Sequence, residues 1–311
     1  IPVFNAPFSN TRSVAEMVIA ECIMLIRGIP EKNALAHRQI WMKSASNAVE
    51  ARGKNLGIIG YGHIGSQVSI LAEALGMNVF YFDIVKKLSL GNARSVNSLN
   101  ELLQVSDIVT LHVPSTELAR NMISDEQIQK MKEGACLINA SRGEVMDYKA
   151  VARGLGSKHL GGVAADVFPS EPSTNGEPFV NELQEFENVI LTPHIGGNTV
   201  EAQANIGFEV AEKLVKYSDS GSTIGAVNFP EISLPPNVSK QRFLHIHQNM
   251  PGVLREVNDF FSSKNINISA EFLQTDSDIG YVIIETESEL DLTDLSDLRN
   301  IPHTIRTRII F

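Results

Sequence analysis

The chain has 311 residues, of which 43% are hydrophobic and 20% charged, as expected for a globular protein with about two or three domains. Its formal net charge of −10 and its pI of about 5.3 argue against nucleic acid or an anionic membrane as the main partner. The two cysteines, Cys22 and Cys136, lie in apolar surroundings without motif spacing. This predicts buried thiols in a reducing compartment, with no disulfide and no metal site. No signal peptide or membrane span is visible, so we expect a cytoplasmic protein.

The chain opens on a strand-like piece followed by a turn, and a predicted helix follows at 11–28. Ser13 and Glu16 have capping-box spacing at the start of this segment, and apolar residues recur through it at helical intervals. The segment carries too many charges for a membrane span, so we expect an ordinary helix of a globular domain.

From residue 55 to 194, short apolar runs alternate with helical stretches such as 66–75 and 125–131. The runs are apolar without alternation, as expected for parallel strands that are buried on both faces of a sheet. This rhythm predicts a doubly wound, Rossmann-type α/β sheet. The predicted strands are 55–60, 78–83, 107–113, 135–140, 161–167 and 188–192.

After a longer helix predicted at 199–217, the segment 218–240 is rich in Ser, Gly and Pro and is the best candidate for a linker or hinge. Beyond it the pattern predicts strand, helix, two strands joined by a turn, helix and strand. This βαββαβ order is typical of a ferredoxin-like domain. The predicted elements are 242–247, 251–264, 265–275, 280–287, 291–299 and 304–311.

A glycine-rich turn follows the first predicted strand of the α/β region and opens a helix. Its sequence matches the dinucleotide-binding pattern G-x-G-x-x-G. The glycines would allow a tight turn and a close approach of the backbone to a pyrophosphate at the helix N-terminus. The candidate cofactor contacts here are Gly60, Gly62, His63, Ile64 and Gly65, with His63 facing the cofactor without a chemical role.

Asp83 ends the second predicted strand, where an acid can accept hydrogen bonds from both ribose hydroxyls of NAD. Its charge would repel a 2′-phosphate, so NAD is favoured over NADP. Lys86 and Lys87 nearby keep NADP open as an alternative.

Three polar residues follow three different predicted strands: Arg142, Glu171 and His194. Because the carboxyl ends of parallel strands share one edge of the sheet, these side chains can converge there. Arginine suits a substrate carboxylate, histidine can move the proton of a hydroxyl group, and a carboxylate beside the histidine would favour its protonated form. Taken singly, each residue could equally be a polar group in a surface loop.

These motifs, in this order, resemble the successive signatures of the NAD-dependent D-2-hydroxyacid dehydrogenases. The resemblance implies that Arg142 binds the substrate carboxylate, Glu171 supports the histidine and His194 is the acid and base. It also implies further cofactor contacts, at Ala140, Ser141, Arg142, Asp166, His194, Gly196 and Gly197.

The segment 244–254, LHIHQNMPGVL, resembles the start of an ACT domain, a small ligand-binding regulatory fold. Family members with a C-terminal ACT domain oxidise 3-phosphoglycerate in the first step of serine biosynthesis. The resemblance implies feedback inhibition by L-serine, bound where ACT domains of two subunits pair, and therefore a homodimer or homotetramer. The matching positions are His247, Asn249 and Asn267.

These comparisons predict a remnant of a substrate-binding domain at 1–9 and an NAD-binding domain at 10–196. A return segment and linker would follow at 197–237 and an ACT domain at 238–311. The N-terminal part of the substrate domain would be lacking, so we expect little activity from the chain as given. Two alternatives stay open: another D-2-hydroxyacid dehydrogenase acting on 2-hydroxyglutarate, glyoxylate or lactate, or a non-catalytic NAD-sensing protein.

Overall fold

The computed structural model describes residues 1–234, 241–287 and 292–310, so the predicted elements that reach 235–240, 288–291 and 311 lie partly outside the described residues. The chain divides into two compact units. We call residues 10–203 the nucleotide unit, and residues 1–9 together with 204–311 the C-terminal unit.

The nucleotide unit is built on a seven-stranded sheet in which every pairing is parallel. The strand order is β3-β2-β1-β4-β5-β6-β7, which reverses direction between β1 and β4. In such sheets the point of reversal, at the carboxyl ends of the strands, is where ligands bind. The strands are β1 (Asn55–Ile59), β2 (Asn78–Phe82), β3 (Arg94–Ser95), β4 (Ile108–Leu111), β5 (Ala135–Asn139), β6 (Leu160–Ala165) and β7 (Val189–Leu191).

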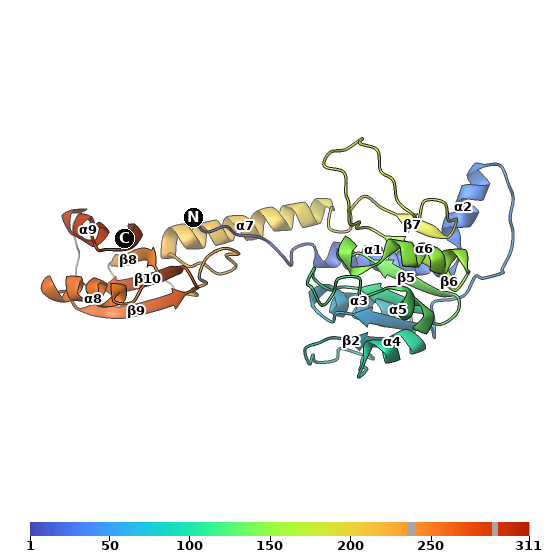
Figure 1. Ribbon diagram of the computed structural model, residues 1–311, viewed down its shortest axis with the longest axis horizontal. Helices are drawn as coiled ribbons and strands as arrows, with labels where there is room; N and C mark the ends of the chain where they lie inside the picture. The colour runs from blue at the N-terminus through green and yellow to red at the C-terminus, as the bar shows by residue number, and fades with distance from the viewer. Residues whose placement is uncertain (235–240, 288–291, 311) are drawn as a thin grey trace. The chain divides into compact units, whose positions relative to one another are not determined.

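Helices cover both faces of this sheet (Figure 1), which confirms the predicted doubly wound fold. α1 (Thr11–Ile26) and α3 (His63–Ala74) pack on one face, while α4 (Leu99–Val105), α5 (Asp125–Lys130) and α6 (Tyr148–Gly156) pack on the other. The two apolar layers explain why the strands are apolar along their whole length. No helix within the described residues is long and apolar enough to cross a membrane.

The start of α1 differs from the predicted capping box. The helix begins at Thr11, and its N-cap residue, Asn10, makes no side-chain cap bond. Ser13 and Glu16 therefore lie inside the helix, where the Ser13 hydroxyl is 2.8 Å from the Thr199 hydroxyl and Glu16 pairs with Arg12. The spacing was right for a capping box, but the helix starts three residues too early for it.

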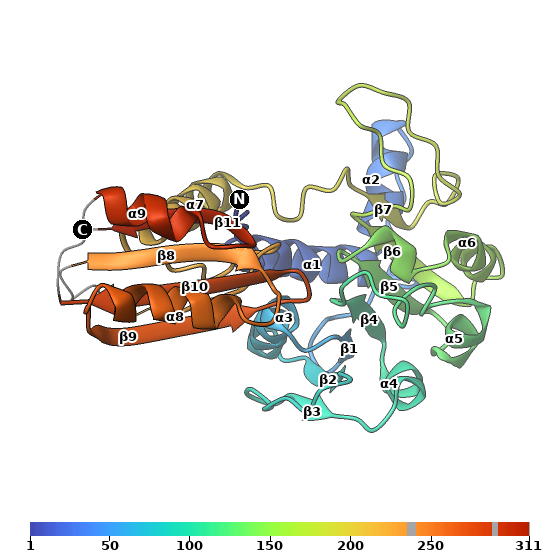
Figure 2. The same ribbon diagram turned by 60° about the vertical axis from the view of Figure 1, so that its left-hand side comes forward.

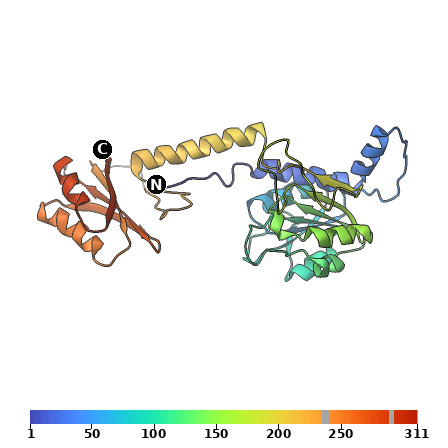
Figure 3. The ribbon, with the colours of Figure 1, turned by 45° about the horizontal axis from the view of Figure 1, so that its top comes forward.

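A second helix, α2 (Ile29–His37), was not predicted from the sequence. No residue of α2 is buried, so it lacks the apolar stripe on which helix prediction depends. The helix and the segment after it extend away from the sheet of their unit (Figure 3). That segment carries three exposed apolar side chains in succession, Ile40, Trp41 and Met42.

The C-terminal unit is built on a four-stranded antiparallel sheet in the order β11-β8-β10-β9, with α8 and α9 on one face (Figure 2). This arrangement confirms the predicted ferredoxin-like fold. The helix α7 (Val200–Ser220) precedes it, and the division between the two units falls within its first turn. The elements are β8 (Gln241–Gln248), α8 (Val253–Ser263), β9 (Ile268–Thr275), β10 (Ile279–Thr286), α9 (Leu292–Arg299) and β11 (Thr304–Ile310).

The predicted linker is packed against the other face of this sheet. In residues 221–234, Phe229 and Ile232 are buried in one apolar cluster with side chains of β8 and β10. Thr223 Oγ1 donates to Pro230 O (2.7 Å) and accepts from Ile232 N (2.8 Å). The prediction of a hinge is therefore wrong for this part of the segment.

Hydrogen bonds also hold the start and the middle of residues 221–234 in the C-terminal unit. Tyr281 OH donates to Gly221 O over 2.8 Å. Val227 N donates to Val3 O (2.9 Å), and Val3 N donates to the Asn228 side chain (2.8 Å), so the start of the chain lies along this segment.

A buried ion pair joins β8 and β10. Arg242 and Glu285 are opposite each other in the register, and their side chains are 0% and 8% exposed. The guanidinium of Arg242 binds the Glu285 carboxylate and also donates to Ser220 O at the end of α7 (2.8 Å). The pair therefore connects the sheet to the helix that enters the unit.

We predict that Glu285→Ala destabilises the C-terminal unit by about 3–5 kcal/mol, because it leaves the buried guanidinium without its counter-charge. Urea unfolding followed by circular dichroism measures the loss. Glu271→Ala, at an exposed position of β9, is the control and should change stability by less than about 0.5 kcal/mol. Equal effects from the two variants would contradict a structural role for the pair.

Candidate active site

The glycine turn after β1 lies at the point where the strand order reverses, and α3 begins at His63. Gly60 has a φ of +91°, and a Cβ there would lie 2.3 Å from His112 O. A Cβ on Gly65 would lie 2.2 Å from Gly60 O, whereas a Cβ on Gly62 would point into open space. Gly60 and Gly65 are therefore needed for close packing, and Gly62 keeps the surface clear at the helix N-terminus. This turn fits the pyrophosphate of a dinucleotide.

Asp83 stands directly after β2, and its carboxylate is fixed by the backbone. Oδ2 accepts from Tyr61 N (2.8 Å) and Oδ1 accepts from Val85 N (2.9 Å). Each carboxylate oxygen has a second acceptor site, so the group can still bind two ribose hydroxyls. Residues 60–65 and Asp83 thus fit the diphosphate and the ribose of an adenosine diphosphate moiety.

His194 and Glu171 form a direct hydrogen bond: His194 Nδ1 lies 2.8 Å from Glu171 Oε2. The other carboxylate oxygen, Oε1, accepts from Phe168 N (2.9 Å). Burial acts to raise the pKa of Glu171, but the bonds from His194 and Phe168 and the charges of His194 and Arg142 lower it below its usual value. An ionised carboxylate at Nδ1 requires a proton on that nitrogen, which leaves Nε2 to exchange a proton with a substrate.

The backbone around His194 is held by Asp166, the first residue after β6. Asp166 Oδ1 accepts from the Thr192 hydroxyl (2.6 Å) and from Ile195 N (2.8 Å), and Oδ2 accepts from Gly196 N (2.8 Å). His194 itself has a φ of +55°. This left-handed conformation is unfavourable for a residue with a side chain, and the bonds on both sides of it keep it in place.

Arg142 is brought to the same place from the end of β5. Buried Asn139 organises the turn: its Oδ1 accepts from Ser141 N (3.1 Å) and its Nδ2 donates to Arg142 O (3.0 Å). A Cβ on Gly143 would lie 2.1 Å from the carbonyl carbon of Phe168, so this loop abuts the loop that carries Glu171. The Arg142 side chain is exposed and, among the described residues, forms no ion pair at salt-bridge distance.

The structure therefore brings Arg142, Glu171 and His194 together from the ends of β5, β6 and β7. Three further residues support them and were given no such role from the sequence. Asn139 and Thr192 were missed, although both stand at strand ends, and Asp166 was expected only as a cofactor contact. Within the described residues no cluster of three His, Cys, Asp or Glu side chains could hold a metal ion.

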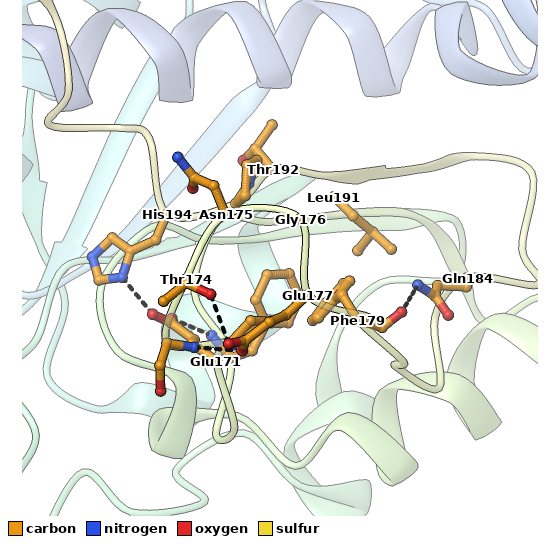
Figure 4. Close-up of a pocket in the computed structure, with 14 residues that line it drawn as sticks. Glu171, Thr174, Asn175, Gly176, Glu177, Phe179, Gln184, Leu191, Thr192 and His194 are labelled. Atoms are coloured by element: carbon orange, nitrogen blue, oxygen red, sulfur yellow. Dashed lines mark hydrogen bonds and ion pairs between the residues drawn. The ribbon is translucent and has the colours of Figure 1, made fainter.

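A pocket of about 450 Å³ borders the His194–Glu171 pair (Figure 4). It is lined by Phe168, residues 171–177, Phe179, Gln184 and residues 191–194. Glu177 is one of these lining residues and accepts from the Thr174 hydroxyl (2.7 Å). Because Glu171 and Glu177 make the walls acidic and neither Arg142 nor Gly62 lines them, this pocket is not suited to a carboxylate substrate or to the cofactor phosphates.

Residues 19–196 match the family described as "D-isomer specific 2-hydroxyacid dehydrogenase, NAD binding domain". The chain belongs to this family. It is accordingly an NAD-dependent dehydrogenase, and the predicted cofactor is confirmed. Residues 243–306 match an "AHAS small subunit-like ACT domain", which confirms the resemblance of the C-terminal unit.

Curated relatives and solved structures agree with this assignment. The chain is 57% identical to "D-3-phosphoglycerate dehydrogenase" of Escherichia coli and 55% identical to that of Haemophilus influenzae, in each case over the whole chain and 76% of the relative. A D-lactate dehydrogenase from Lactobacillus jensenii, solved with NAD+, superposes with a TM-score of 0.68 at 27% identity over 74% of this chain and 72% of its own. One from Aquifex aeolicus, solved with NAD and lactic acid, gives 0.66 at 32% identity over 74% of each chain.

The three residues predicted to bind serine do not meet within one chain. His247 is the second-last residue of β8 and lies close in sequence to Asn249, whose Nδ2 donates to Asp276 O (2.7 Å), just past the end of β9. Asn267 immediately precedes the start of β9. Since β9 has eight residues, Asn267 lies roughly 25–30 Å from the other two.

His247 also belongs to a short chain of buried polar side chains. His245 lies between the Thr304 hydroxyl (2.8 Å from Nε2) and His247 (3.3 Å between the two Nδ1 atoms). Burial, and then the charge of His247, lower the pKa of His245 to about 4. Burial also lowers the pKa of His247. Both rings are therefore neutral near pH 7.

We predict that the C-terminal unit loses stability as the pH falls from about 6.5 to 4. Because the folded-state pKa of His245 is depressed, the unfolded chain takes up the proton first, and the free energy of unfolding falls with pH in this window. From His245 the loss between pH 7.5 and 5 is roughly 2 kcal/mol. Urea unfolding at the two pH values measures it, and His245→Gln should remove most of the difference. An unchanged difference in the variant would contradict the assignment.

Proposed function

We propose that the chain catalyses the NAD-dependent oxidation of 3-phosphoglycerate to 3-phosphohydroxypyruvate, the first step of L-serine biosynthesis. The observation that carries the proposal is the His194–Glu171 hydrogen bond of 2.8 Å beside Arg142, in a chain that also has an ACT unit. The relatives with 55–57% identity over the whole chain bear the name D-3-phosphoglycerate dehydrogenase, which supports this choice of substrate.

In this proposal each of the three residues has one task. Arg142 binds the substrate carboxylate through two parallel N–H donors and so orients the hydroxyl-bearing carbon. His194 Nε2 accepts the hydroxyl proton during oxidation and returns it to the carbonyl oxygen during reduction. Glu171 holds the ring by Nδ1 and stabilises the imidazolium that forms. The bound nicotinamide supplies the hydride acceptor.

Residues of the turn and of the segment 192–197 would hold the cofactor. Gly60, Gly62 and Gly65 allow the pyrophosphate to reach the N-terminus of α3, and Asp83 binds the ribose. Ala140, Ser141, Asp166, Gly196 and Gly197 stay predicted contacts. In this structure the Asp166 carboxylate accepts three bonds from protein donors, so we assign it the positioning of residues 192–196 first.

Two other functions are less well supported. The solved D-lactate dehydrogenases favour a lactate-type substrate, but the ACT unit and the identity to the curated relatives favour 3-phosphoglycerate. A non-catalytic NAD sensor would have no use for a paired histidine and carboxylate beside an arginine.

We predict that the natural protein consumes NADH with phosphohydroxypyruvate and that His194→Ala lowers kcat by about 10²–10⁴-fold, because the proton donor is lost. Glu171→Gln should cost less, since the amide oxygen can still accept from Nδ1. The NADH affinity of both variants should stay unchanged in fluorescence titrations. Turnover is followed by NADH absorbance, with pyruvate, glyoxylate and 2-oxoglutarate as competing substrates.

Each alternative has its own outcome in that assay. If an unphosphorylated 2-oxo acid is turned over faster than phosphohydroxypyruvate, the substrate is that acid and its hydroxy acid, and not 3-phosphoglycerate. Retained activity in His194→Ala would remove the histidine from the mechanism. Tight NADH binding without turnover of any of the acids would favour the sensor.

We further propose that L-serine binds between two copies of the C-terminal unit. β9 forms one edge of the sheet, and an edge strand can pair with the same strand of a second copy about a two-fold axis. Antiparallel pairing of this kind sets the start of β9 in one copy beside its end in the other. Asn267 of one copy then lies near His247 and Asn249 of the other, and two equivalent sites form.

A homodimer or homotetramer is also supported by the segment after α2. Ile40, Trp41 and Met42 are consecutive apolar residues, and the Trp41 side chain is 87% exposed. Contiguous exposed apolar groups of this kind are typical of interfaces between subunits. A cytoplasmic location stays a proposal, supported by two free, buried thiols.

We predict that His247→Ala and Asn267→Ala each abolish inhibition by L-serine while leaving turnover intact. If the site is shared between copies, a mixture of the two variants, unfolded and reassembled together, forms hybrids with one intact site. Serine inhibition should then return in part. Inhibition that stays absent in the mixture, with mixed assembly verified by differential tags, would contradict a shared site.

A further inference from the structure

Two stacked tyrosine side chains lie next to the glycine turn and Asp83, the residues expected to bind the adenosine end of NAD. Tyr61 stands between the first two glycines of the turn, and Tyr81 stands two residues before Asp83. Their ring centroids are 3.8 Å apart and their planes differ by 18°. Both side chains are buried, so the phenol hydroxyls must find partners within the protein.

The partners of these hydroxyls are concentrated on one short segment. Tyr61 OH donates to Ser69 Oγ on α3 (3.0 Å) and accepts from Leu90 N (3.3 Å). Tyr81 OH donates to Lys87 O (3.0 Å) and lies 3.0 Å from Ser89 Oγ. Because a carbonyl oxygen can only accept, the Tyr81 proton goes to Lys87 and the Ser89 hydroxyl donates to Tyr81. Each phenol therefore uses one donor and one acceptor site.

The segment held in this way, residues 84–90, continues directly from Asp83. Its side chains contribute little to the core: Ile84 is 78% exposed and Leu88 is 90% exposed. A segment with so few buried contacts is held mainly by its hydrogen bonds. The tyrosine hydroxyls supply bonds at Lys87, Ser89 and Leu90, and the backbone N–H of Tyr61 fixes Asp83 Oδ2.

Ring packing alone does not explain this arrangement. Two phenylalanines would fill the same space without any hydroxyl to satisfy. The hydroxyls instead join the glycine turn, α3 and residues 87–90 around the ribose-binding carboxylate. Tyr61 does this from within the turn itself.

We propose that Tyr61 and Tyr81 are positioning residues for the adenosine end of NAD, which set the affinity for the cofactor without taking part in proton or hydride transfer. Through their hydroxyls they hold residues 84–90 and the Asp83 carboxylate in the geometry that receives the adenosine ribose. The inference rests on NAD binding and not on the identity of the hydroxy acid.

Tyr61→Phe and Tyr81→Phe test this proposal in the natural protein. Each removes one hydroxyl and keeps the ring stack, and we expect the Kd for NADH and for ADP-ribose to rise about three- to ten-fold in each. ADP-ribose lacks the nicotinamide, so an equal effect on both ligands assigns the loss to the adenosine side. At saturating NADH, kcat and the KM for the 2-oxo acid should stay unchanged.

Tyr281→Phe is the matched control. It removes the buried hydroxyl that donates to Gly221 O in the C-terminal unit. We expect a comparable loss of thermal stability but an unchanged Kd for ADP-ribose. Asp83→Ala serves as the reference for a direct ribose contact and should weaken both ligands more than either tyrosine variant does.

Two outcomes would overturn the proposal. If the tyrosine variants lower the melting temperature but bind ADP-ribose as the wild type does, the pair is only part of the core. If kcat falls while the affinity for NADH is kept, the tyrosines act on the chemistry and not on the adenosine site. Because both hydroxyls hold one segment, the double variant should weaken binding by less than the product of the single effects.

Discussion

The arrangement of the active site depends on one carboxylate, that of Asp166. Its three hydrogen bonds to residues 192–196 fix the backbone on both sides of His194, which holds a left-handed conformation at a cost of roughly 1–3 kcal/mol. The position of the imidazole, and through it the contact with Glu171, follows from this backbone geometry. A buried ionised carboxylate is itself unfavourable, and three donors at 2.6–2.8 Å offset that penalty.

A second acid in the same region bears on this balance. Glu21 of α1 is buried, and neither of its carboxylate oxygens has a hydrogen-bond partner among the described residues. Burial, and then the charge of Asp166, raise the pKa of Glu21 to about 8. Glu21 is therefore mostly protonated at neutral pH. A protonated Glu21 carries no charge, so it does not repel the Asp166 carboxylate that holds the loop of His194.

The sequence predicted those parts of the fold and site that depend on local rules. Two motifs can be recognised from a few residues of sequence: a G-x-G-x-x-G turn between strand and helix, and an acid at the end of the next strand. The parallel sheet then implied that Arg142, Glu171 and His194 share an edge, although 52 positions separate the first from the last. The fold-level part of that argument is confirmed by the strand order, and the residue roles stay proposals.

The features that were missed or mistaken depend on contacts between distant segments. The composition of 218–240 suggested a linker, yet Phe229 and Ile232 pack on a sheet that needs cover on its second face. Seven successive residues of β8 are buried, but they include Gln241, Arg242, His245 and His247, so the sequence of the strand does not indicate that both of its faces are covered. α2 has no apolar stripe, so periodicity could not reveal it. The distance between Asn267 and His247 follows from strand register, which a motif does not contain.

Hydrogen bonds to the carboxylates near the site help to explain how a protein with a net charge of −10 can bind a cofactor and substrate that are both anionic. Near the site, Asp83, Asp166 and Glu171 each accept hydrogen bonds from protein donors at both oxygens. These donors lower the local negative potential that an approaching anion meets.

Two further features supply the attraction. The N-terminus of α3, kept open by Gly62, presents backbone N–H groups to the cofactor phosphates. Arg142 is exposed and forms no ion pair among the described residues. Its Nη1 donates to Ser141 O (2.6 Å), and the guanidinium has further N–H donors for a carboxylate from solution. The acidity of the chain as a whole is therefore compatible with an anion site, because exposed charges act mainly within about 8 Å at physiological ionic strength.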